Sequence, residues 1–314
     1  MKKILATVMA VVMMLAVMPM SYAYEAVEID GYGEGVPQIK VTNIIGKDEF
    51  LSRPDPYGNI PLGYVCQAPV TVELAAESMF MFEGRQCIPV GDALKYSVKV
   101  LPVEGFVEIG EYNEETEEYT YKTVPYTEEL AWEHAGFVKG SKMTITKPGL
   151  YWICGRYEAV SGAAEVYLNV KGEAKPNASK VYVDGKEMEF DAYNIADNNY
   201  FKIRDIAMAI NGSEKQYNVI WDNEKKAINL LKNTPYTVAG GELSKGAADV
   251  MPTWANTSQT LLDGEYVGFP SYTIGESNYY MLRDLGEVFD FSVEWDAATN
   301  SIHVDTTKSY VRPE

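Results

Sequence analysis

The sequence predicts a mixed fold, in which an all-β sandwich domain is followed by an α+β domain built of two ββαββ repeats, each an antiparallel sheet around a helix. In residues 24–170, apolar and polar positions alternate in one run after another, the pattern of strands that bury one face. Residues 181–307 carry one order of strands and helix twice, over 181–233 and 261–307. Residues 171–180 contain Gly, Pro and Ser without an apolar pattern, which predicts a linker between the two domains.

Residues 1–23 have the features of a cleaved secretory signal peptide. Lys2 and Lys3 precede an uncharged apolar run, and a small-x-small cleavage site ends at Ala23. No Cys follows that site to take a lipid anchor, and no second apolar run of about twenty residues could span a bilayer. We therefore expect a secreted, extracellular protein whose mature form has no transmembrane segment. Association with the cell surface stays open.

The chain is strongly acidic, with 45 Asp and Glu against 27 Lys and Arg. Removal of the signal peptide takes away two lysines, so the mature net charge is near −20. Such a surface repels nucleic acid and anionic lipid, which excludes both as partners. The densest acidic cluster is expected to be the solvated tip of a hairpin, with weak binding of a divalent cation as the alternative. It comprises Glu111, Glu114, Glu115, Glu117 and Glu118.

The strands of the first domain follow from period-two alternation. Val70, Val72 and Leu74 alternate with polar residues, and the same spacing recurs up to about residue 170. One helix is expected to interrupt the strands at 127–135, because Thr127 is a suitable cap and glutamates occupy the first turn. Strands with one buried face, separated by turns that contain Pro and Gly, predict a β-sandwich.

The register of the two copies can be read from matching residues. Those up to the predicted helix are separated by 79 positions, and those after it by 74. The first group pairs Asp184 with Asp263, Tyr193 with Tyr272, Tyr200 with Tyr279, Arg204 with Arg283 and Asp205 with Asp284, and the second pairs Trp221 with Trp295, Asp222 with Asp296 and Ile228 with Ile302. Five residues within roughly 211–216 are therefore missing from the second copy. This difference predicts a loop, because a strand or helix would not absorb the deletion.

Each copy begins with a short apolar strand that ends in Asp-Gly, a strong turn dipeptide. A second strand is expected around 190–195, and after a polar turn Ile203, Ile206 and Ile210 fall on one face of a helix. Asp205 lies near the helix start, where a negative charge meets the positive end of the dipole. Two further strands complete the copy. Because a copy of roughly 45 to 50 residues is near the lower limit for an independent core, we expect the pair to pack as one domain.

The Tyr-Phe-Lys-Ile-Arg-Asp segment at 200–205 and the Trp-Asp-x(5)-Ile segment at 221–228 resemble the copper amine oxidase N-terminal-like domain, also called the stalk domain. The resemblance covers about residues 180–307, less than half of the chain. It implies two tandem copies of an antiparallel sheet wrapped around one helix, in a module that recurs in secreted and surface proteins of Gram-positive-type bacteria. The shared motifs are core and turn residues, so the family name implies no activity.

The repeated residues are interpreted as structural. A redox copper centre would need several imidazoles, and the chain has two, His134 and His303, in different domains, so we predict no cofactor and no metal. The recurring Tyr and Trp residues are interpreted as large core fillers, in preference to rings that stack on sugars. Arg204 and Arg283 are expected to pair with a carboxylate or to cap carbonyl groups.

Three cysteines in an exported chain leave at least one thiol unpaired. Cys66 and Cys87 form the favoured disulfide, since both lie in one segment and would close a loop of modest length. Cys154 is expected to be a buried, inert thiol, because its domain offers only His134 as a base.

The sequence contains no Gly-x-Ser-x-Gly, His-Glu-x-x-His or Cys-x-x-Cys motif and no phosphate-binding Gly loop. The leading hypothesis is a non-enzymatic binding or spacer protein of the bacterial cell envelope, in which stalk-like repeats support a sandwich domain that recognises an envelope glycan or a surface protein. The alternative is a secreted, glycan-active hydrolase with two carboxylates about 5 to 10 Å apart in the sandwich domain.

Overall fold

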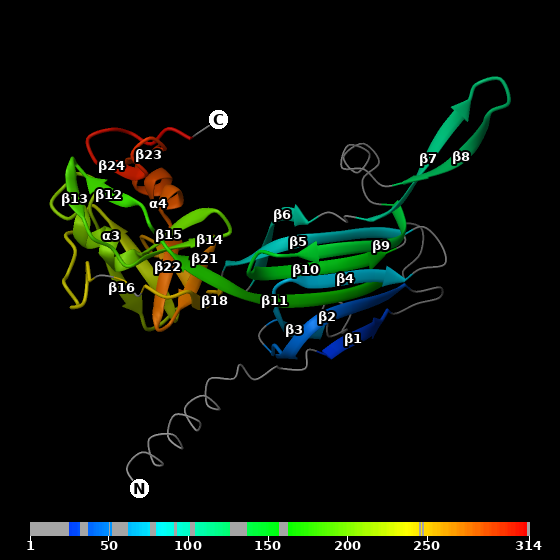
Figure 1. Ribbon diagram of the computed structural model, residues 1–314, viewed down its shortest axis with the longest axis horizontal. Coiled ribbons are helices and arrows are strands. Elements are labelled where there is room, and N and C mark those ends of the chain that lie inside the picture. The colour runs from blue at the N-terminus through cyan, green and yellow to red at the C-terminus, as the bar shows by residue number, and fades with distance from the viewer. Residues whose placement is uncertain are drawn as a thin grey trace, which may run out of the picture.

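The computed structural model shows two β-rich lobes joined by one long strand, β11 (Ala163–Pro176) (Figure 1). It describes residues 25–31, 37–49, 51, 62–75, 80–90, 93–100, 104–125, 137–156, 163–244, 246 and 248–312. The predicted combination of an all-β part and a part with helices is confirmed, and this described portion holds two helices. Neither is long and apolar enough to cross a membrane. The predicted signal peptide at 1–23 and the predicted helix at 127–135 lie outside the described residues.

The first lobe contains eleven described strands, of which seven form a closed ring. The eleven strands are β1 (Glu25–Asp30), β2 (Gln38–Lys47), β3 (Leu62–Gln67), β4 (Val70–Ala75), β5 (Phe80–Val90), β6 (Ala93–Val100), β7 (Glu104–Asn113), β8 (Glu118–Pro125), β9 (Phe137–Ile145), β10 (Gly149–Arg156) and β11. From β2 the pairing runs through β4, β9, β5, β10 and β11 to β3, which pairs back to β2. This closure depends on Asn43, a left-handed residue with φ 57°, because β2 pairs with β4 before it and with β3 after it.

The interior of the ring is apolar and receives side chains from every strand of the circuit. Val70, Val72 and Leu74 in β4 point inward and are buried, as their alternation predicts. Each such side chain stabilises the fold by about 1.5–3 kcal/mol when it leaves water. The two sheets expected of a sandwich are thus joined along both edges around one core.

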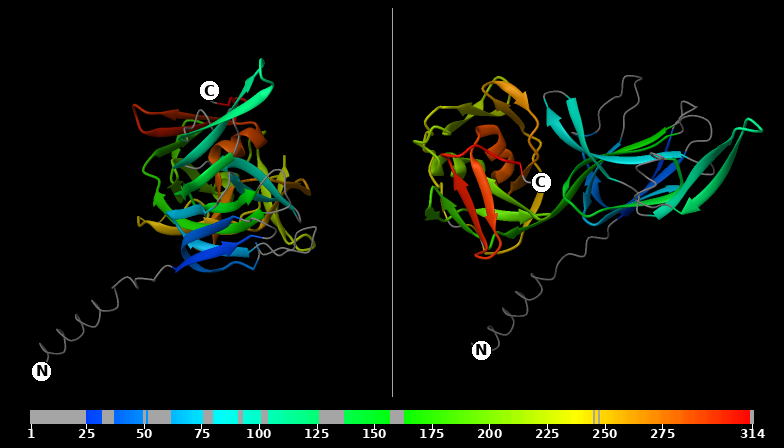
Figure 2. Two further views of the ribbon diagram at one scale, coloured as in Figure 1. Left: turned by 90° about the vertical axis from the view of Figure 1, so that its right-hand side faces the viewer. Right: turned by 90° about the horizontal axis from the view of Figure 1, so that it is seen from above.

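The β7–β8 hairpin extends away from the first lobe (Figures 1 and 2). Its turn at 114–117 and the adjoining residues are exposed, so the prediction that the acidic cluster forms a solvated hairpin tip is confirmed for Glu114, Glu115, Glu117 and Glu118. Tyr112 and Tyr119 pack against each other across this hairpin, with ring centroids 4.9 Å apart.

The second lobe contains both repeats. The first copy comprises β12 (Lys180–Val183), β13 (Lys186–Met188), β14 (Ala192–Ile195), β15 (Asn198–Lys202), α3 (Ile203–Ala209), β16 (Tyr217–Asp222) and β17 (Ala227–Lys232). After β18 (Met251–Ala255), the second comprises β19 (Gln259–Leu262), β20 (Glu265–Val267), β21 (Ser271–Ile274), β22 (Ser277–Met281), α4 (Leu282–Phe289), β23 (Ser292–Asp296) and β24 (Ser301–Asp305). Two hairpins precede each helix, so the predicted ββαββ order misses two short strands per copy. The strong Asp-Gly turn creates the first hairpin, and a second tight turn creates the next.

The two copies exchange their hairpins. The first hairpin of the first copy joins the last hairpin of the second copy through the parallel strands β12 and β24. The corresponding arrangement joins β16–β17 to β19–β20 through the parallel strands β17 and β19. The middle hairpins meet through β15 and β22. Neither copy closes over its own helix alone, and the pair packs as one unit around a shared core in which Tyr217 stacks on Phe289 at 3.9 Å.

The predicted linker at 171–180 is mostly strand. Residues 171–176 belong to β11, which leaves the ring and pairs with β18 and β14 of the second lobe. Ala174 is fully buried there, and the Tyr272 hydroxyl donates to the Pro148 carbonyl at 2.7 Å. The linker is predicted from composition alone. Gly172 and Pro176 occur in this strand, and their presence does not distinguish a strand from a linker.

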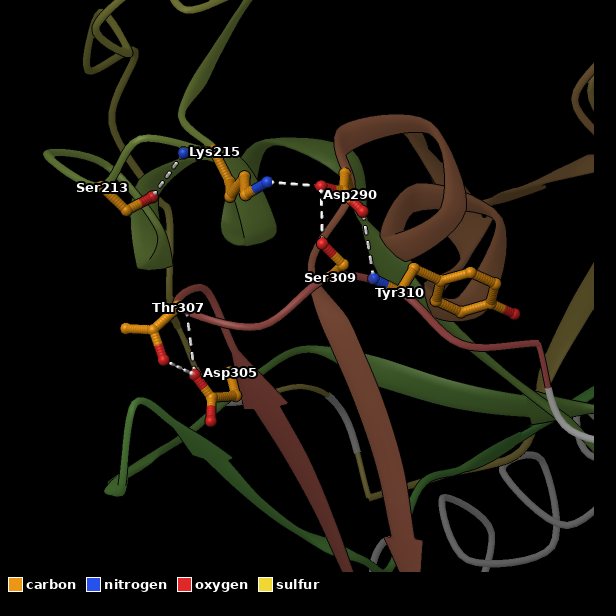
Figure 3. A network of polar contacts seen from close by, with 7 residues as sticks. All are labelled: Ser213, Lys215, Asp290, Asp305, Thr307, Ser309 and Tyr310. Atoms are coloured by element: carbon orange, nitrogen blue, oxygen red, sulfur yellow. Dashed lines mark hydrogen bonds and ion pairs between the residues drawn. The ribbon is translucent and has the colours of Figure 1, made fainter.

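The five-residue insertion of the first copy lies in the loop between α3 and β16, as predicted. From this loop Lys215 Nζ reaches Asp290 Oδ2 at 2.6 Å, at the end of α4 in the second copy (Figure 3). Asp290 also accepts a bond from the Tyr310 N–H at 3.1 Å. Its counterpart Asn211 accepts one from the Tyr236 N–H at 2.9 Å. The equivalence of the copies therefore extends beyond their predicted ends.

Candidate functional site

A groove of about 500 Å³ lies in the second lobe, where the end of β11 meets both copies. Its walls are residues 175–179, the β14–β15 turn, the start of α4 and strand β23. The residues that recur at matching positions of the two copies are called signature residues. Two of them from the second copy, Arg283 and Trp295, line the groove. The amides that line it are Asn177, Asn194, Asn198, Asn199 and Asn300, and the other charged residues are Lys175, Asp197 and Glu294.

The four signature tyrosines are core residues, as predicted. They form two edge-to-face pairs between the copies: Tyr193 meets Tyr279 with centroids 5.4 Å apart, and Tyr200 meets Tyr272 at 4.9 Å. All four are buried, and the two pairs are related by the offset of the repeat. Burial raises the pKa of each hydroxyl of the Tyr200–Tyr272 pair. These rings hold the middle hairpins together and are not available to a ligand.

The prediction that the two signature tryptophans fill the core is wrong. Trp221 is 47% exposed and Trp295 is 46% exposed. Both lie at the outer end of a strand, directly before the turn residues Asp222 and Asp296, whose carboxylates accept backbone N–H bonds across the turn. The aspartates thus explain why the motif recurs as a turn, but they do not explain an exposed indole.

The two signature arginines differ in their contacts. Arg204 Nη1 donates to the Val219 carbonyl at 3.2 Å and lies 3.4 Å from the Tyr236 hydroxyl, which confirms the predicted structural role. Arg283 is exposed, and it makes no hydrogen bond or ion pair with any residue that the structure describes. The structural interpretation therefore has no support at Arg283, which instead lines the groove.

The aspartates at the helix starts also differ. Asp205 is fully buried, and its Oδ1 accepts the Leu243 N–H at 3.1 Å. Burial raises the pKa of Asp205, and that hydrogen bond opposes the rise. The Oδ2 atoms of Asp205 and Asp284 are both buried without a partner among the described residues. Burial, with a smaller contribution from Glu287, raises the pKa of Asp284 to about 6, against the opposing charge of Arg312.

A further difference between the copies lies in the wall of the groove. Asn256 uses Oδ1 to accept the Ser258 N–H at 2.9 Å and Nδ2 to donate to Ser271 Oγ at 3.2 Å. Asn177 is its counterpart, and its Oδ1 accepts the Ser179 N–H at the same distance of 2.9 Å. The residue equivalent to Ser271 is Ala192, so Asn177 Nδ2 is left buried without an acceptor among the described residues.

The cysteines are free and buried, so the predicted Cys66–Cys87 disulfide is wrong. Cys66 faces the interior of the ring, whereas Cys87 and Cys154 belong to a separate apolar cluster. Strands β10 and β11 separate β5 from β3, and three strand spacings are about 14 Å, twice what a disulfide spans. Burial raises the pKa of Cys66 and of Cys87 to about 12 and also raises that of Cys154, in agreement with the inert thiol expected there.

His303 belongs to no metal-binding cluster among the described residues. His303 stacks on Tyr182 with centroids 5.0 Å apart, and its Nε2 lies 2.8 Å from Ser301 Oγ. His134 lies outside the described residues, and within them no three His, Cys, Asp or Glu side chains gather to hold a metal.

The first lobe presents a second polar and aromatic region on β5, β6, β10 and β11, outside the core of the ring. Tyr96 is 44% exposed and packs against Trp152 at 5.2 Å. Glu83 and Glu165 flank Cys154 on neighbouring strands, one in β5 and one in β11. Their Cα atoms are therefore about 10 Å apart by strand spacing. Glu83 is 3.2 Å from Arg85 Nη2, and Glu165 lies 3.6 Å from Cys154 Sγ.

Sequence reasoning missed the groove and the importance of Asn177. The extension of the 79-residue offset upstream, from Asn177 to Asn256, could have revealed that the repeat begins before residue 180. No protein-family model matches the chain, and a search of curated proteins also finds no match.

Proposed function

We propose that the chain is an exported, non-enzymatic binding or spacer protein of the bacterial cell envelope. In this proposal the repeats form a stalk-like module that itself carries a carbohydrate-binding groove. The observation that carries it is the position of Trp295, an indole 46% exposed in the wall of a 500 Å³ groove whose other walls are rich in asparagine amides. The signature motifs, which keep their order and spacing in both copies, support membership of the stalk domain family.

The chemistry of the lining suits a sugar. A flat aromatic face can cover the apolar C–H face of a pyranose ring, while a few convergent polar groups fix the orientation of the ligand. An asparagine amide both donates and accepts hydrogen bonds, as a sugar hydroxyl does. The middle hairpins that hold Asn194, Asn198 and Asn199 are fixed by the buried tyrosine pairs, so the site is built on rigid elements.

The experiment compares Trp295→Ala with Trp221→Ala in the full mature protein. Both residues have nearly the same exposure and precede the same turn, but only Trp295 lines the groove, so Trp221→Ala is a matched control. Retention on purified cell-wall glycans should fall at least about tenfold for Trp295→Ala and stay unchanged for Trp221→Ala. Equal retention of the two variants, or no retention of the parent protein, would contradict the proposal.

The Glu83–Glu165 pair favours a second candidate, a glycan-active hydrolase. Its Cα atoms, about 10 Å apart, are compatible with the carboxyl separation of an inverting pair. Glu83 is held by Arg85 and Glu165 by a buried thiol, so the pair is less open than the groove. Release of reducing ends from wall glycans by the parent protein, abolished in Glu165→Gln, would establish the hydrolase.

A further inference from the structure

We infer that the groove selects a saccharide that carries a carboxylate group, and that Arg283 is the residue that binds this carboxylate. The inference rests on the proposed carbohydrate-binding function and adds the chemical class of the ligand.

The first argument is the state of the arginine. The same signature position holds Arg204 in the first copy, where the guanidinium is fixed by a carbonyl and a phenol. In the second copy Arg283 makes no hydrogen bond or ion pair with the described residues and lines the groove. A guanidinium stays charged at every physiological pH, and its planar fork matches a carboxylate in a bidentate pair.

The second argument is the local charge. The mature chain has a net charge near −20, so most of its surface repels an anionic sugar. The groove differs, because Lys175 and Arg283 balance Asp197 and Glu294. No ion pair joins Arg283 to either of these acids within the described residues, and Glu294 Oε1 lies 3.3 Å from Ser292 Oγ instead. The cation is therefore left for a ligand.

The third argument is the surrounding donors. Met281 precedes α4 without a side-chain cap, and Met281 and Leu282 line the groove beside Arg283, so uncapped N–H groups begin at this wall. Asn177 also lines the groove, and its Nδ2 is buried without an acceptor where the other copy supplies Ser271. The N–H groups at the start of α4 and the guanidinium both favour a ligand rich in acceptor oxygens.

The test uses polygalacturonate, alginate and hyaluronate, each beside its carboxyl-reduced form, which keeps the sugar rings and loses the charge. The full mature protein should bind at least one native polymer about tenfold more tightly than its reduced form, as expected for one charge-assisted bidentate pair. Arg283→Gln should abolish this preference, and Arg283→Lys should restore part of it because the charge returns without the fork. Lys186→Gln removes one charge from an exposed position in β13, outside the groove, and should leave the preference intact.

The outcomes separate the two proposals. Equal binding of native and reduced polymers, still lost in Trp295→Ala, overturns the carboxylate inference and leaves carbohydrate binding standing. A preference for native polymers that persists in Arg283→Gln assigns the charge recognition elsewhere and also overturns the inference. Binding of no polymer in either form overturns it together with this class of ligand.

Discussion

Asp284 gives the sharpest test of the electrostatics of the second lobe. Its pKa is raised from an ordinary 3.8 to about 6, first because burial disfavours the charged form, and its Oδ2 has no partner among the described residues. The folded state therefore binds a proton that the unfolded state releases between about pH 4 and pH 6. Stability contributed by this group is present below that window and is lost as the pH rises through it. The shift of about two pH units corresponds to at most about 3 kcal/mol.

The perturbation is Asp284→Asn, and the assay is the free energy of unfolding in urea at pH 4.5 and at pH 7.5. Compared with the variant, the parent protein should lose about 2 kcal/mol more between these pH values, because part of the change has already occurred at pH 4.5. The test uses the pH dependence of the difference in unfolding free energy between the parent and the variant. It therefore holds even if the new amide changes the stability of the variant equally at both pH values. Asp290→Asn is the control without a pH dependence in this window, because Lys215 lowers the pKa of Asp290 below its ordinary 3.8 and its contribution is lost only at lower pH. Parallel curves for the parent and Asp284→Asn would refute the assignment of a buried, unpaired carboxyl.

Three further predictions concern the relation between the copies. Ala192→Ser should give Asn177 Nδ2 an acceptor and stabilise the protein by about 1 kcal/mol in urea unfolding. Ser271→Ala should destabilise it by a similar amount, and unchanged unfolding midpoints in both variants would contradict the pairing. The fragment 180–233 should unfold with less cooperativity in a thermal melt than 180–307, because the parallel partner of its first hairpin lies in the other copy, and equal cooperativity would show that one copy closes by itself. Lys215→Ala should lower the melting temperature at low ionic strength, with a smaller effect in about 1 M salt; a loss independent of salt would argue against an ionic clamp.

The repeat could be predicted from the sequence because its signature positions fix local geometry. The Asp-Gly turns, the apolar face of each helix and the Trp-Asp turns depend on residues close together in the chain, and the structure places them where the pattern indicates. The hairpin exchange could not be predicted in this way. The apolar residues of a strand such as Val181–Val183 indicate that the strand is buried. They do not indicate whether the strand that pairs with it lies in the same copy or in the other.

The groove was missed for a related reason. The recurrence of Trp221 and Trp295 indicates that both copies need a tryptophan at this position. A single sequence does not show whether such a tryptophan is buried in the core or exposed at the surface, and both are exposed. Arg283 was likewise assigned the role of Arg204, because the two occupy the same place in the motif. Arg204 contacts Tyr236, which lies after the first copy and itself donates to Glu242. Tyr310 occupies the equivalent place after the second copy, but Arg283 makes no hydrogen bond to it.

The duplication itself provides the strongest argument for where function lies. The exchange of hairpins places equivalent residues of the two copies in equivalent backbone, so a side chain that the fold requires should make the same contacts twice. The tyrosine pairs and the turn aspartates do so. Arg283 and Asn177 do not, although their counterparts show that the same backbone can satisfy both groups internally. These two departures from symmetry, unlike that of Asp284, line one groove with an exposed tryptophan, and a shared location is what selection for a ligand would produce.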